Sequence, residues 1–144
     1  MKIKSKIFNT DNSKTTILIR LMTGAVFLSE GMQKFLFPET LGAGRFAKIG
    51  LPAAEFLANF TGCFEIICGI LVLIGLFVRA ACTALIVIMI AAIAATKTEI
   101  LIDKGFWKML HESRTDWAML LGSIFLLIKG AGSWSLDKRW LNNG

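Results

Sequence analysis

Four long apolar segments, separated by clusters of polar and turn-forming residues, divide the chain. They run from about 16 to 37, 54 to 77, 79 to 96 and 116 to 130. Each is close to the ~20 residues that a helix needs to cross the hydrocarbon core of a bilayer. Because lipid offers no partner for an open sheet edge, the pattern predicts helices rather than strands. We therefore expect an all-α bundle of four transmembrane helices, with residues 1–144 forming a single domain.

The connections between these segments differ in length. Gly75 and Arg79 bracket a very short one, which forces the second and third helices to be antiparallel neighbours. The first connection ends near Pro52, a residue suited to the first turn of the second helix. The third, at 104–114, mixes Trp107 and other apolar residues with charge, which is typical of a segment at the membrane interface.

The positions of Lys and Arg indicate the orientation. Nine lie on the side of the termini and the 75–79 turn: Lys2, Lys4, Lys6, Lys14, Arg20, Arg79, Lys129, Lys138 and Arg139. Seven lie on the opposite side: Lys34, Arg45, Lys48, Lys97, Lys104, Lys108 and Arg114. Since basic residues are enriched in cytoplasmic loops, both termini are predicted to be cytoplasmic.

The composition supports a membrane protein. The chain is 55% hydrophobic and 18% charged, with a mean hydropathy of +0.65, whereas soluble proteins carry roughly 25% charge. Two Pro and three Cys argue against a disordered chain and against a disulfide-rich secreted scaffold. The net charge of +6 does not indicate nucleic-acid binding, because the basic residues flank apolar runs and form no helix face along phosphates.

Charged residues within the apolar segments are the most informative positions, since each costs roughly 2.5–3.5 kcal/mol at mid-membrane and normally faces protein or water. In the first segment a polar and small-residue stripe spans about 120° of the helix. Its members are Arg20, Thr23, Gly24, Phe27, Glu30, Gly31 and Lys34. Glu30 and Lys34 are spaced i,i+4 in the order that favours mutual neutralisation.

Two further segments supply matching faces. In the second segment the face carries Thr61, Glu65, Cys68, Val72 and Gly75, and in the fourth it carries Asp116, Ser123 and Gly130. With cytoplasmic termini, four charges gather toward the outer half of the bundle: Glu30, Lys34, Glu65 and Asp116. These four are the predicted ligand-binding residues of a polar pocket that opens outward.

Two other interpretations of these charges stay open. Polar side chains commonly hold membrane helices together, so the charges, with Arg20, Thr61 and Ser123, would form a structural network. The second alternative is that the charges form a path for protons or ions.

The remaining reactive side chains indicate little chemistry of their own. No C-x-x-C motif is present, so thiol–disulfide catalysis is not expected, and whether Cys68 meets Cys82 stays open. His111 is the only histidine and is expected in an exposed loop. One histidine cannot ligate a haem with two imidazoles, and no Cys or His spacing is typical of zinc. We therefore predict no metal or haem site.

Several motifs occur in an order that resembles one family. They are Arg20 and Gly24, Glu30-Gly31 with Lys34, the set Gly50, Pro52, Gly62 and Glu65, and the set Leu73, Gly75, Leu76 and Arg79. Residues 130–137 read G-A-G-S-W-S-L-D, in which Gly130, Gly132, Ser135 and Asp137 match the family motif G-x-G-x-W-S-L-D. This order, over about 20–137, resembles the DoxX-like (DoxX/DoxD) integral membrane proteins.

The resemblance implies a four-helix, multi-pass protein of the bacterial inner membrane. Members are associated with redox systems, as a subunit of thiosulfate:quinone oxidoreductase or as a membrane partner of superoxide dismutase and a sulfurtransferase. The sequence has no cofactor motif of its own, which argues against independent catalysis and leaves the cofactor open, with a quinone as one candidate. Fold-level analogy alone does not fix the reaction.

We therefore predict a small membrane subunit of a redox system, with a quinone or similar amphipathic molecule in the pocket. Lys34 would donate to an oxygen of the ligand, and Glu65 or Asp116 would exchange the proton that accompanies reduction. One alternative is a scaffold that recruits soluble oxidative-stress or sulfur-metabolism enzymes through the basic N-terminus and the segment after Gly132. Another is a small-solute transporter, which is disfavoured because repeats and broken helices are not visible. Homo-oligomerisation stays open.

Overall fold

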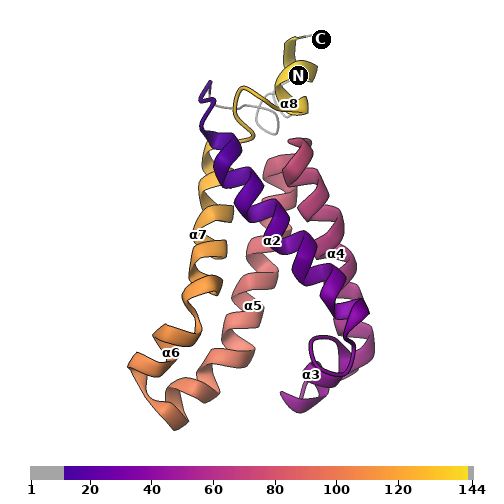
Figure 1. The fold of residues 1–144 in the computed structure, drawn as a ribbon, viewed down its shortest axis with the longest axis vertical. Coiled ribbons are helices and arrows are strands. Elements are labelled where there is room, and N and C mark those ends of the chain that lie inside the picture. The colour runs from indigo at the N-terminus through magenta and orange to yellow at the C-terminus, as the bar shows by residue number, and fades with distance from the viewer. Residues whose placement is uncertain (1–11, 143–144) are drawn as a thin grey trace.

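The computed structural model describes residues 12–142, and every regular element in that range is a helix (Figure 1). The four longest helices are α2 (Thr16–Leu36), α4 (Ala54–Ile74), α5 (Val78–Lys104) and α7 (Arg114–Lys129). Three short helices complete the described chain: α3 (Ala43–Lys48), α6 (Phe106–Glu112) and α8 (Leu136–Asn142). The predicted all-α class is confirmed.

The four apolar segments coincide with the four longest helices, and two of their ends differ from the prediction. Helix α4 ends at Ile74 rather than near residue 77, because Gly75 adopts a left-handed conformation with a φ of 74°. Helix α5 continues to Lys104 rather than ending at Thr96, because neither Gly nor Pro interrupts the chain before Gly105, which has a φ of 80°. The predicted interfacial segment contains α6. Pro52 lies in the turn before α4 rather than in its first helical turn, since Ala53 is the N-cap residue.

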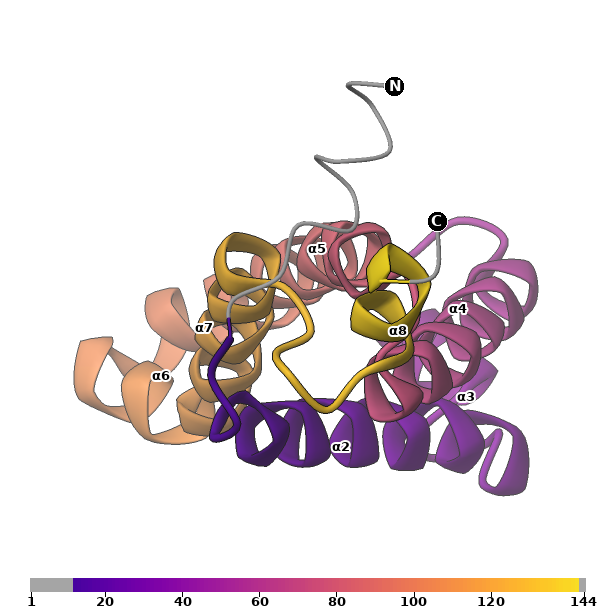
Figure 2. The ribbon, with the colours of Figure 1, turned by 90° about the horizontal axis from the view of Figure 1, so that it is seen from above.

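The helices are arranged as two pairs, with α2 packed along α4 and α5 packed along α7. The turn between α4 and α5 lies at the same end of the bundle as α8 and the N-terminal end of α2, which we call the terminal end (Figure 1). Helices α3 and α6 lie at the other end, the α3/α6 end. Seen from above, α2, α4, α5 and α7 surround a centre that the connection from α7 to α8 crosses (Figure 2). This connection thus covers the terminal end.

Glycines let α2 and α4 approach until their backbones touch. A Cβ atom on Gly31 would lie 2.8 Å from the carbonyl oxygen of Gly62, and one on Gly69 would lie 2.8 Å from the amide nitrogen of Leu28. Both distances are shorter than real Cβ contacts allow. Close approach through small residues is typical of helix pairs in membranes, and it fixes the position of α2 along α4.

Two helices, Ala54–Ile74 and Val78–Lys104, are long and apolar enough to cross a membrane, with mean hydropathies of 2.1 and 2.3 over their most apolar windows. Only 33% and 28% of those windows are buried within the chain. Their exposed large apolar side chains include Phe56, Phe60, Phe64, Ile67, Ile70, Val87 and Ile90. A soluble monomer rarely exposes so large an apolar face, whereas contact with lipid requires one.

Candidate ligand-binding cavity

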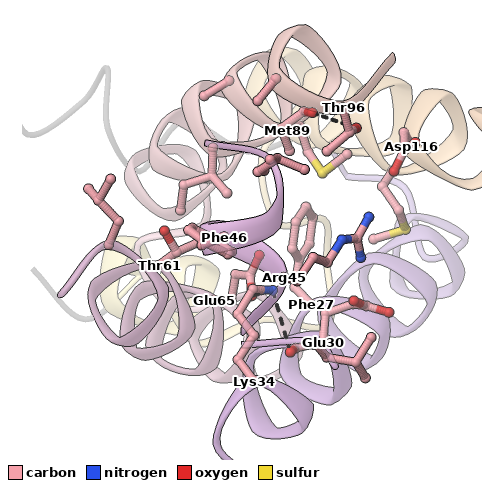
Figure 3. A pocket seen from close by; sticks show the side chains of 18 of the residues that line it. Phe27, Glu30, Lys34, Arg45, Phe46, Thr61, Glu65, Met89, Thr96 and Asp116 are labelled. Atoms are coloured by element: carbon pink, nitrogen blue, oxygen red, sulfur yellow. Dashed lines mark hydrogen bonds and ion pairs between the residues drawn. The ribbon is translucent and has the colours of Figure 1, made fainter. Parts of the chain in front are cut away.

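A cavity of about 520 Å³ lies among the four long helices toward the α3/α6 end (Figure 3). Its walls include the four residues predicted to bind a ligand, Glu30, Lys34, Glu65 and Asp116. Its volume falls in the range of small-molecule sites, roughly 300–1,000 Å³. The structure thus brings the four charges to one cavity, and their binding of a ligand stays a prediction.

The Lys34 ammonium and the Glu65 carboxylate form an ion pair inside the cavity. The Nζ atom of Lys34 lies 2.5 Å from Oε2 of Glu65, and the two side chains are only 12% and 6% exposed. The neutralisation of Lys34 by Glu30 that their i,i+4 spacing favours is not formed, because Nζ reaches only the backbone oxygen of Glu30, at 3.5 Å. Glu30 is exposed and can be hydrated, whereas the buried Glu65 carboxylate needs a counter-charge.

Asp116 lies across the cavity from that pair (Figure 3) and has a different basic partner. Its Oδ2 atom is 3.0 Å from Nζ of Lys97, which also donates to the backbone oxygen of Glu112 at 3.0 Å. Asp116 lies in the first turn of α7, where the helix dipole favours a negative charge. This contact was not predicted, because the third apolar segment was expected to end at Thr96 and Lys97 to lie among the basic residues on the side opposite the termini.

Helix α3 adds Arg45 and Phe46 to the cavity wall, and neither residue is among the predicted ligand-binding residues. Phe46 and Ile49, three residues apart, are the signal that could have predicted a one-sided apolar turn. Among residues 12–142, no ion pair joins Arg45 or Glu30 to another side chain. The cavity wall therefore carries one cation and one anion without an ion-pair partner in the described chain.

The deeper wall of the cavity is apolar. Phe27, Met89 and Met119 are 2%, 7% and 4% exposed and come from three different long helices. Thr61 and Thr96 add hydroxyl groups, and that of Thr96 donates to the Ala92 carbonyl at 2.8 Å. The cavity is therefore amphipathic, with charged side chains from α2, α3, α4 and the start of α7 and apolar side chains on the rest of its wall.

Arg20 lies at the terminal end of the bundle and donates hydrogen bonds to backbone carbonyl oxygens. Its guanidinium donates from Nε to Val72 at 2.9 Å and from Nη2 to Leu73 at 2.6 Å. Nη1 donates to the carbonyl oxygens of Ala131 at 3.1 Å and Trp134 at 2.5 Å. At 2% exposure, Arg20 ties α2 to the end of α4 and to the connection after α7.

Within the described residues, no hydrogen bond joins Arg20, Thr61 and Ser123, the side chains assigned to the alternative structural network, to one another. Thr61 lines the cavity, and the Ser123 hydroxyl donates to the Met119 carbonyl of its own helix at 2.8 Å. Helical periodicity assigns residues to a face but not to a depth in the bundle, so residues on inward faces need not meet.

The motif near the C-terminus organises helix ends. Asp137 accepts hydrogen bonds from the backbone N–H groups of Phe77 at 2.8 Å and Val78 at 3.2 Å, which caps α5. Burial raises the pKa of the Asp137 carboxyl, and the two N–H donors oppose that rise. Ser135 donates to the Gly132 carbonyl at 2.7 Å, and Gly130 is the C-cap residue of α7. These residues stabilise the fold at the terminal end.

The other reactive side chains stand apart from the charged site. All three cysteines are free thiols: Cys68 and Cys82 are buried, and Cys63 is exposed. His111 is exposed as predicted but lies in the last turn of α6 rather than in a loop. Within residues 12–142, no three His, Cys, Asp or Glu side chains are grouped so as to hold a metal ion.

Comparisons with known proteins give consistent results. The DoxX family model matches residues 15–98. "Uncharacterized membrane protein Rv3486" of Mycobacterium tuberculosis is 49% identical over 140 residues, covering 93% of this chain and 86% of that protein. "Putative oxidoreductase CatD" of Bacillus subtilis is 31% identical over 122 residues, covering 85% and 84% of the two chains. No solved structure matches significantly.

Proposed function

This chain belongs to the DoxX family of membrane proteins, and on that premise we propose that it is a subunit of a redox system that binds a quinone or a similar amphipathic molecule. The family match confirms the resemblance to DoxX-like proteins that the sequence motifs predicted. The activity itself is our inference from the cavity.

The observation that carries this proposal is a buried ion pair at the wall of an otherwise apolar cavity. Lys34 and Glu65 are nearly inaccessible, yet they line an open volume together with Phe27 and Met89. A purely structural pair would be expected in close contact with packed side chains, since interiors contain few voids larger than a water molecule. A flat ring with polar oxygens and an apolar body matches both parts of this wall.

The residues have complementary roles in this proposal. Lys34 and Arg45 offer N–H donors to the oxygens of the ligand, while Glu30, Glu65 and Asp116 offer carboxylates for proton exchange. Reduction of a quinone to a quinol consumes two electrons and two protons. The chain supplies binding groups and a proton route, and a partner redox enzyme supplies the electrons. The name of the relative CatD, an oxidoreductase, supports a redox context.

We further propose that all four long helices cross the bacterial inner membrane, with both termini in the cytoplasm. Ser133 N–H donates to the Ser13 carbonyl at 3.1 Å, so the two ends of the described chain meet, as an even number of crossings requires. The charged residues of α2 are placed away from lipid: Arg20 is buried in the bundle, and Glu30 and Lys34 line the cavity. The rest of this helix is apolar enough to contact lipid. Reporter fusions at each terminus, active only in the cytoplasm or only in the periplasm, test this orientation.

Quinone binding by the purified protein tests the function. We expect a saturating short-tailed ubiquinone or menaquinone analogue to raise the unfolding midpoint of the wild type, because a ligand at 100 times its Kd stabilises the native state by about 2.7 kcal/mol. Glu65→Gln should weaken binding at least about tenfold, since Lys34 loses its ionic partner and a proton-exchanging group disappears.

Glu55→Gln is the matched control. Glu55 is an exposed residue in the first turn of the same helix and lies outside the cavity wall, so its substitution should leave binding unchanged. A wild type that neither binds nor copurifies with any quinone would refute the proposed function. Equal binding by Glu65→Gln and the wild type would remove Glu65 from the site.

A further inference from the structure

The uncharged side of the cavity is the wall that α5 supplies. Val87 and Ala91 of α5 line it, and Leu57 of the neighbouring helix α4 lines it as well. The charged lining residues belong to α2, α3, α4 and α7: Glu30, Lys34, Arg45, Glu65 and Asp116. The cavity is thus asymmetric, because α5 alone among the four long helices contributes no charged residue to its wall.

The cavity reaches the outer surface on this apolar side. Val87 lines it and is nevertheless 63% exposed, and Ala91 is also exposed. Helices α4 and α5 are joined by the tight turn at 75–77 and diverge away from it (Figure 1). In a membrane-embedded bundle the surface of α5 at this depth faces lipid, because α5 is among the most apolar helices of the chain.

Small side chains leave room at this opening. Ala91, Ala92 and Ala95 all line the cavity, within about 100° of one helix face at 100° per residue. The Glu65 carboxylate lies deeper, 5% exposed. A molecule whose polar head reaches Glu65 therefore has an uncharged route along α5 for an attached hydrocarbon chain.

We infer that the cavity binds a ligand with a long apolar tail, and that the tail lies between α4 and α5 along Leu57, Val87 and Ala91 and extends into the bilayer. This inference rests on the proposed function and adds the ligand's class, an isoprenoid or acyl-tailed quinone that enters from the lipid rather than from water. Tail placement between α4 and α5 costs little, since the tail exchanges one apolar environment for another.

A steric test in nanodiscs compares two probes: a benzoquinone with an isoprenoid tail and the same head group without a tail. Concentrations are expressed as mole fractions in the lipid, so that partitioning does not favour either probe. Ala91→Trp and Val87→Trp place a large ring in the opening. Overpacking of this kind costs about 1–3 kcal/mol, or roughly 5- to 150-fold in affinity, and we expect a loss in this range for the tailed probe alone.

Ala94→Trp is the matched control, because Ala94 lies on α5, is exposed, and does not line the cavity. It should bind both probes as the wild type does. All three positions are exposed, so the variants should fold, and their unfolding midpoints verify this. If the tailed probe binds Ala91→Trp and Val87→Trp as it binds the wild type, or if both probes are weakened equally, the tail position is wrong and the proposed function stands. If the wild type binds neither probe, the proposed function itself fails.

Discussion

Substitution of Arg20 should be among the most destabilising single changes in this chain. Its guanidinium donates to four backbone carbonyls, those of Val72, Leu73, Ala131 and Trp134, while only 2% of the residue is exposed. In Arg20→Ala the Val72 carbonyl keeps the N–H of Gly75 as a donor at 3.2 Å, so the loss falls mainly on the other three. A buried acceptor left without its donor costs about 1–3 kcal/mol, and partial relaxation reduces the sum, so we expect about 3–5 kcal/mol.

The measurement is the free energy of unfolding in mixed micelles, obtained by titration with a denaturing detergent. Arg20→Lys should lose about half as much, because a single ammonium cannot reach carbonyls on two sides as a planar guanidinium does. Arg139→Ala is the control: Arg139 is exposed at the same end and should change stability by less than about 0.5 kcal/mol. A loss below about 1 kcal/mol for Arg20→Ala would refute the assignment of Arg20 as the tie between these segments.

Three further substitutions test other parts of the structure by the same unfolding measurement. Lys34→Met should lower the free energy of unfolding by about 3–5 kcal/mol, because it leaves Glu65 buried without a counter-charge. The double variant with Glu65→Gln should recover most of this loss. A double variant no more stable than Lys34→Met would contradict the pairing. Gly31→Leu should separate α2 from α4, since a Cβ would lie 2.8 Å from a backbone oxygen of Gly62, and an unchanged stability would mean that the helices do not touch there. Gly75→Ala should cost at least about 1–2 kcal/mol, because φ is +74° and a Cβ would lie 2.6 Å from the Arg20 guanidinium; a neutral result would argue against this turn.

Helical periodicity was sufficient to predict which faces turn inward. Five of the seven residues of the predicted stripe on α2 are buried, namely Arg20, Thr23, Gly24, Phe27 and Gly31. Glu65, Cys68 and Val72 of α4 are buried as well. A charged side chain facing lipid is energetically costly, and a glycine favours close packing only where it faces another helix. The positions of such residues around a helix therefore indicate which face is directed toward the other helices.

Periodicity was insufficient to predict which charges meet. The pairing of Lys34 with Glu65 depends on how far α2 slides along α4, and that register is set by contacts such as Gly31 against Gly62. Lys97 reaches Asp116 only because α5 extends beyond its apolar stretch. The carbonyl partners of Arg20 carry no side-chain signal, so a sequence pattern could place Arg20 inside the bundle but could not identify its role.

The two ends of the bundle are held together by different kinds of interaction. At the terminal end, Arg20 joins α2 to the end of α4 and to the connection after α7, and Asp137 caps α5. Toward the α3/α6 end, each buried or half-buried ion pair joins helices within one pair: Lys34–Glu65 links α2 to α4, and Lys97–Asp116 links α5 to α7. Neither of these ion pairs therefore joins the α2–α4 pair to the α5–α7 pair, whereas at the terminal end the hydrogen bonds of Arg20 connect both pairs.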